Sequence, residues 1–105
     1  MKTSELTGAA LDWAVARCEG EGEAAWAAHR DAFAYSSTWV CGGPIIERER
    51  IGIWSSEADD HDGEWCARTI NTYITYSPTP LIAAMRCYVA SKLGDEVDVP
   101  KELQP

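Results

Sequence analysis

A strand pattern that runs directly into a capped helix is the feature that most limits what this chain can fold into. Residues 65–76 are rich in β-branched and aromatic residues, and residues 70–76 alternate between two faces, which predicts a single β-strand. Thr79 and Pro80 then have the residue types preferred at the N-cap and at the first position of a helix. The apolar residues that follow predict a helix that continues to Gly94, where a glycine can end it.

A second helix is predicted near the N-terminus. Its apolar residues recur at the spacing that places them on one helical face, and Gly20 follows as a stop signal. The residues of this face are Leu11, Ala14, Val15 and Cys18. Trp13 lies opposite this face, beside Leu6. A helix with apolar residues on both faces is either covered twice or offers one face to a partner, and we expect these two residues to be available to a partner. The simplest such partner is a second copy, which predicts a twofold homo-oligomer.

A second strand is predicted around residues 52–54, with Trp54 in the core. A turn follows it, so this strand can pair with the longer one as a hairpin. Together these elements predict the α+β class, with a small antiparallel sheet packed with an N-terminal and a C-terminal helix. Residues 1–94 are expected to form one domain, and residues 95–105 an acidic C-terminal tail that lies along it.

The charge of the chain argues against two classes of partner. The net charge is −8, and the nine Lys and Arg residues are scattered, so we expect no general nucleic-acid binding. No apolar run is long enough to cross a bilayer and no export signal is visible, so we expect no membrane partner. The acidic block at residues 57–64 is typical of a solvated turn.

The pattern of metal-ligating residues predicts no metal site. The four cysteines are widely separated and include no C-x-x-C pair, which is unlike a zinc site or a disulfide framework. The acidic block lacks the first and last ligands of a calcium loop. No nucleophile or base stands in a recognisable catalytic pattern, so we predict neither a cofactor nor catalytic residues.

The segment 37–47 is predicted to be a loop. Gly42 and Gly43 have no side chains to shield their amide groups, and Pro44 stiffens the exit from the segment. Such a loop can let a ligand approach the backbone closely. The alternative is a tight turn without a ligand.

We expect this loop to meet the start of the last helix and to form a binding site for an anionic group. The helical amides after Thr79 are unpaired and carry partial positive charge. Trp39 would cover a ring attached to the anion, and Arg86 would either anchor the far side of the ligand or pair with Glu47 or Glu49. The predicted ligand-binding residues are Thr38, Trp39, Gly42, Gly43, Pro44, Glu47, Thr79, Pro80 and Arg86.

Three segments resemble the NinX family, a group of small accessory proteins of lambdoid phages and prophages. They are the opening residues 1–16, the segment 42–49 and the segment 79–90. The chain differs from the family pattern at residues 38–40 and in its acidic turn at 57–64. The resemblance implies a phage protein that acts in the host cytoplasm, and it implies no mechanism.

Two functions are compatible with this setting. The first is a noncatalytic counter-defence protein that binds and sequesters a small nucleotide-derived ligand. It would use the chain's many aromatic residues and the predicted anion site. The second is a protein-interaction module that inhibits or redirects a host protein, for example a defence protein, through an apolar helix face and the acidic blocks.

Overall fold

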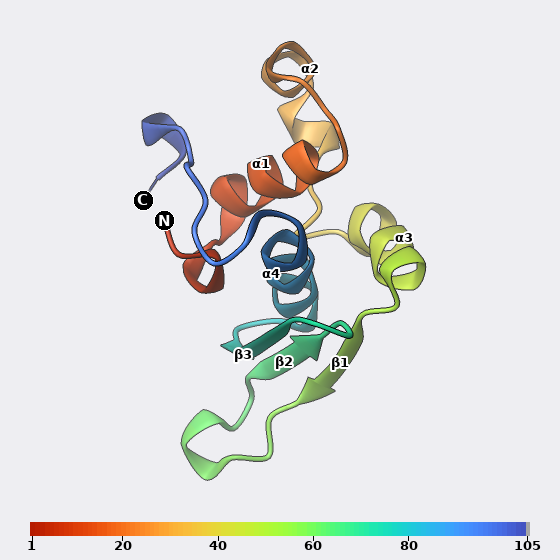
Figure 1. The fold of residues 1–105 in the computed structure, drawn as a ribbon, viewed down its shortest axis with the longest axis vertical. Helices are drawn as coiled ribbons and strands as arrows, with labels where there is room; N and C mark the ends of the chain where they lie inside the picture. Colours follow the sequence, from red (N-terminus) through yellow and green to blue (C-terminus); the bar gives the residue numbers. More distant parts are fainter. Residues whose placement is uncertain (105) are drawn as a thin grey trace.

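Helix α4 (Pro80–Leu93) is the centre of the fold (Figure 1). We describe residues 1–104 of a computed structural model. Helix α1 (Gly8–Cys18) covers one side of α4, and a three-stranded sheet covers another. Helix α3 (Trp39–Glu49) packs beside α4, and the short helix α2 (Glu23–Ala28) lies at the far end of the molecule. The predicted α+β class is confirmed.

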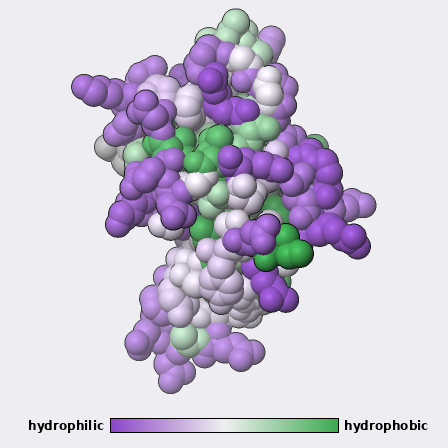
Figure 2. All heavy atoms as spheres, in the orientation of Figure 1, coloured by the Kyte–Doolittle hydropathy of each residue, from purple (hydrophilic) through white to green (hydrophobic). Residues whose placement is uncertain are grey.

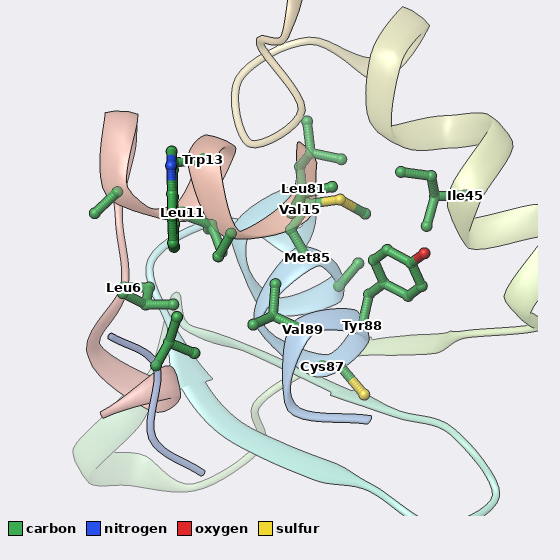
Figure 3. Close-up of a cluster of buried hydrophobic side chains, with 14 of the residues drawn as sticks. Leu6, Leu11, Trp13, Val15, Ile45, Leu81, Met85, Cys87, Tyr88 and Val89 are labelled. Atoms are coloured by element: carbon green, nitrogen blue, oxygen red, sulfur yellow. The ribbon is translucent and has the colours of Figure 1, made fainter. Parts of the chain in front are cut away.

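The ends of α4 form as its sequence predicts. The Thr79 hydroxyl accepts a hydrogen bond from the Ile82 amide at 3.0 Å, Pro80 is the first helical residue, and Gly94 follows the last turn with φ 88°. Helix α4 is apolar around most of its circumference, so other elements can pack on several of its sides. Eight of its residues are buried: Leu81, Ala83, Ala84, Met85, Arg86, Cys87, Tyr88 and Val89. Figure 3 shows several of them meeting α1 and α3 residues in the core.

Helix α1 is buried on more than one face, which contradicts the expectation for Trp13 and Leu6. The Trp13 side chain is only 8% exposed and Leu6 is fully buried. The indole of Trp13 donates to the Glu23 carboxylate of α2 at 3.2 Å, so this side chain is bound within its own chain. The argument for an oligomer through these two residues is therefore wrong, because elements of the same chain cover them.

The sheet contains three antiparallel strands in the order β1 (Gly52–Ser55), β2 (Trp65–Arg68) and β3 (Tyr73–Ser77). The hairpin pairing of the two predicted strand segments is confirmed, since β1 pairs with β2. The single strand predicted over 65–76 is wrong, because it folds back on itself to give β2 and β3. The Thr69 amide donates to the Thr72 carbonyl at 2.9 Å and closes the turn between them.

One face of the sheet packs against α4 and the other is open. Ile53, Ala67 and Ile74 are aligned across the three strands on the packed face, where Ala67 and Ile74 are buried. Trp54 lies on the other face and is only partly buried, so its predicted place in the core is wrong. Its ring contacts Tyr73, which is 60% exposed.

The acidic segment 57–64 is a turn, as predicted, and it contains a short 3-10 helix (Asp59–His61). Figure 2 shows a mainly hydrophilic surface over this connection between β1 and β2. The His61 ring stacks on Tyr76 with centroids 3.5 Å apart and pairs with Glu64 at 2.8 Å. Tyr76 has φ 55° at an irregularity in the β2–β3 pairing. The stack therefore connects the turn to the sheet.

Residues 39–49 form helix α3, so the predicted loop at 37–47 is wrong. Gly42, Ile45 and Ile46 recur with helical spacing, and they form the face that meets the core. Pro44 lies on an exposed part of the helix. Packing of the buried face overrides the low helix propensity of two glycines and a proline, since tertiary contacts supply most helical stability.

The C-terminal tail packs on the domain. Val97 and Val99 are buried in the hydrophobic core, so the boundary expected after residue 94 does not separate the tail from the core. The Val97 amide donates to the Met1 carbonyl at 2.9 Å, and the Met1 amino group donates back to the Val97 carbonyl at 2.9 Å. The two ends of the chain therefore lie side by side (Figure 1).

Candidate functional site

The predicted site residues at 38–47 do meet the start of α4, but as a packed helix. A Cβ atom built on Gly42 would lie 2.5 Å from Cδ1 of Leu81, so the two helices approach as closely as a glycine allows. Gly42 is buried, whereas Trp39 is 54% exposed and Glu47 is exposed at the surface. The amide of Gly42 donates to the Thr38 carbonyl at 3.0 Å. The structure therefore gives Gly42 a role in helix packing.

Arg86 lies apart from these residues, in the interior. Its side chain is 6% exposed, its Nε donates to the Leu6 carbonyl at 2.8 Å, and its Nη1 donates to the Ser77 hydroxyl at 3.0 Å. Burial lowers the pKa of the guanidinium. Arg86 does not form the expected ion pair with Glu49, whose carboxylate instead binds Arg48 and Lys92. Arg86 thus joins the start of the chain to β3 and α4.

None of the nine predicted site residues lines the cleft that stands out chemically, at the turn between β2 and β3. Two adjoining cavities, each of about 420 Å³, open beside this turn. One is lined by Glu49, Arg50, Ser91, Lys92 and the turn residues 69–72. The other is lined by Arg50, Gly52, Arg68, Thr69 and Ile70. We call the two cavities together the basic cleft.

Three cations line the basic cleft although the chain carries a net charge of −8. Glu49 is the one carboxylate in the lining of the cleft. It forms ion pairs with the Lys92 ammonium at 3.4 Å and with Nε of Arg48 at 2.9 Å. These two cations hold the pKa of Glu49 below its usual value. Within the described residues, Arg50 and Arg68 form no ion pair. The local charge of the cleft is therefore positive.

The position of Arg50 follows from the end of α3. Arg48, in the last turn of α3, binds the Glu19 carboxylate through two nitrogens at 3.0 and 2.7 Å, and this contact lowers the pKa of Glu19. The buried Tyr88 hydroxyl accepts from Arg48 at 3.1 Å and donates to Glu19 at 2.5 Å. This network fixes the end of α3 against α1 and α4. Arg50 follows in a left-handed conformation with φ 56° and is exposed beside the cleft.

Arg68 reaches the cleft because its neighbour across the strand is a glycine. Gly52 pairs with Arg68, and a Cβ atom built on Gly52 would lie 3.7 Å from Cγ of Arg68. The arginine side chain therefore lies over the glycine. Tyr73 pairs with Arg68 on its other side, and the rings of Tyr73 and Trp54 lie 5.5 Å apart at 56°. An aromatic pair thus stands next to the arginine on the open face.

The turn also carries an exposed apolar residue. Ile70 is 97% exposed, and Figure 2 shows a strongly hydrophobic group surrounded by hydrophilic atoms over this turn. Thr69, Asn71 and Thr72 add side-chain groups that can donate hydrogen bonds. The cleft therefore combines cations, hydrogen-bond donors and apolar contact. This combination suits an anion attached to a ring.

The phage origin inferred from the three sequence segments is supported independently. Residues 2–92 match the family described as Bacteriophage P22, NinX. The chain belongs to this NinX family. No curated protein matches the NinX-family chain. None of its described helices has the length and apolar character needed to cross a membrane.

Sequence reasoning missed the cleft of this NinX-family protein because its cations lie on three elements. Arg50 follows α3, Arg68 ends β2, and Lys92 lies in the last turn of α4. Only the fold brings them to one cleft, and no local motif marks them. Within residues 1–104, no cluster of three metal-ligating side chains is found, and all four cysteines are free.

Proposed function

We propose that this NinX-family protein binds a small anionic ligand with an aromatic ring, such as a nucleotide, and sequesters it without converting it. The gathering of Arg50, Arg68 and Lys92 in the basic cleft of an acidic protein carries this proposal. In a phage protein, the biological role that fits such binding is counter-defence, in which a nucleotide-derived signal of the host is removed from solution.

The anionic part of the ligand would be held by Arg50 and Arg68. A guanidinium presents several N–H donors in a planar fork that matches phosphate oxygens. Neither arginine has a carboxylate partner within the described residues, so no ion pair has to break before the ligand binds. The overall negative charge of the protein slows the approach of an anion, but contacts at short range depend on the local charge.

The aromatic part would lie on the open face of the sheet. Trp54 and Tyr73 stand beside Arg68, and Tyr73 is exposed enough to contact a base. Stacking of a base on an aromatic side chain contributes about 1–3 kcal/mol. This arrangement retains the ligand class expected from sequence. The proposed site lies in the basic cleft and not at residues 38–47 and Thr79, where the sequence analysis placed it.

Calorimetric titration with adenosine monophosphate and with inorganic phosphate tests the proposal. Arg68→Gln removes one charged contact and should weaken both ligands by roughly 10- to 100-fold. Tyr73→Ser should weaken the nucleotide and leave phosphate unchanged. Arg17→Gln is the matched control, because Arg17 is an exposed arginine on α1 that pairs with Glu23. Equal binding by Arg68→Gln and wild type would contradict the proposed site.

An exposed apolar pair favours a second candidate function, the blocking of a host protein. Trp39 is 54% and Val40 is 87% exposed at the start of α3. Exposed tryptophan is enriched among the residues that dominate protein interfaces. We propose that the homo-oligomer expected from the sequence uses the same pair. Trp39→Ser should then abolish counter-defence activity or dimerisation, measured by phage plating and by light scattering, while Arg68→Gln should leave both intact.

A further inference from the structure

We infer that the basic cleft takes a ligand with two anionic groups held apart by at least one sugar unit. This inference rests on the proposed function and makes it more specific. Its basis is the division of the cleft into two cavities of similar size, each with its own cation. Lys92 lines only the first cavity, and Arg68 lines only the second.

Arg50 stands between the two cavities. It lines both, together with Thr69 and Ile70 of the turn. It follows the last turn of α3, is exposed, and has no ion-pair partner within the described residues. One guanidinium has five N–H donors, so it can contact an anionic group on each side. The two cavities therefore form one site with a shared central cation.

The first cavity, which Lys92 lines, already shows how it would hold an anion. The Lys92 ammonium contacts the Glu49 carboxylate at 3.4 Å and lies over the Tyr88 ring, 5.9 Å from its centroid. These contacts keep the ammonium at the cavity wall. A phosphate in this cavity would compete with Glu49 for Lys92, while Arg48 continues to neutralise Glu49 at 2.9 Å. Asn71 supplies an amide donor in the same lining.

The division of the cleft into two cavities sets the shape of the ligand. A single phosphate can occupy one cavity and use two of the three cations, which leaves the third without a role. Two phosphates joined directly would share one cavity. Phosphates on opposite sides of a sugar would place one group with Arg68 and Arg50 and the other with Arg50 and Lys92. The aromatic ring then remains next to Trp54 and Tyr73.

Three adenosine compounds separate these cases by calorimetric titration of the full chain. They are adenosine monophosphate, adenosine diphosphate and adenosine 3′,5′-bisphosphate. We expect the bisphosphate to bind about tenfold more tightly than the diphosphate, since one further charged contact contributes at least this factor. Lys92→Gln should weaken the bisphosphate more than the monophosphate and so abolish that preference. Lys101→Gln, an exposed lysine of the tail, is the control.

The outcomes distinguish this inference from the proposed function. Equal affinity for the bisphosphate and the diphosphate would overturn the inference, as would an equal loss of all three ligands in Lys92→Gln. In both cases binding of the monophosphate that depends on Arg68 would still support the proposed function. Failure of all three compounds to bind the wild type would overturn both.

Discussion

Replacing Gly42 by alanine tests how closely α3 packs against α4. A Cβ atom at this position would lie 2.5 Å from Cδ1 of Leu81 and 2.7 Å from the carbonyl oxygen of Tyr35. The leucine can change its rotamer, but the carbonyl belongs to the backbone and cannot turn aside. We therefore expect α3 to shift away from α4 in Gly42→Ala.

The neighbouring glycine provides a matched control, because a Cβ atom on Gly43 would meet no atom within 4 Å. Both substitutions replace glycine inside a helix and gain about 0.5–1 kcal/mol from the lower entropy of the unfolded chain. Only Gly42→Ala adds the cost of overpacking, typically about 1–3 kcal/mol. The two variants should differ by this cost. In a domain of this size, each kcal/mol changes the melting temperature by roughly 4–8 °C.

Thermal unfolding followed by circular dichroism measures the difference. We expect Gly43→Ala to melt at or above the wild-type temperature and Gly42→Ala to melt clearly below Gly43→Ala. Equal melting temperatures would show that the two helices do not pack through Gly42. A marked loss of stability in Gly43→Ala would show that residue 43 is not helical, and would refute the assignment of α3.

Three further predictions concern the stability of the fold. The Arg48 contact lowers the pKa of Glu19, so the ionised carboxylate stabilises the folded protein at pH values above its ordinary pKa of 4.5. This stabilisation is lost as the pH falls through the lowered pKa. Glu19→Gln should therefore unfold at a lower urea concentration than wild type at neutral pH, and the difference should disappear in acid. Arg86→Leu should cost about 2–6 kcal/mol in urea unfolding, because it leaves two buried oxygens unpaired at roughly 1–3 kcal/mol each. A loss under about 1 kcal/mol would contradict the structural role. Truncation after residue 96 removes Val97 and Val99 from the core, each contributing about 1.5–3 kcal/mol, so the melting temperature should fall sharply; an unchanged value would show that the tail is not part of the core.

Helix ends that are marked by capping residues could be predicted from the sequence. Thr79 and Gly94 act as the predicted caps of α4, and Gly20 follows α1 with φ 87°. These signals depend on backbone conformation within a few residues, so the rest of the fold does not change them. The turn at residues 69–72 lacks glycine and proline, and high strand propensity on both sides concealed it.

The errors arose where contacts between distant segments decide the structure. Gly42, Gly43 and Pro44 are typical of a loop, but a buried face against Leu81 holds them in a helix. Trp13 appeared to face a partner because a helical pattern cannot show that α2 covers it. The basic cleft could not be predicted for the same reason, since its three cations come from separate elements.

The pairing of the chain ends has a consequence for how the protein forms during synthesis. The Thr3 amide donates to the Asp95 carbonyl at 2.8 Å, and the Thr3 hydroxyl donates to the Gly94 carbonyl at 2.6 Å. Thr3 can therefore make these two hydrogen bonds only after residues 94 and 95 have been synthesised. Contacts this far apart in sequence close slowly. The 3-10 helix Thr3–Glu5 thus reaches its final contacts only after α4 has left the ribosome.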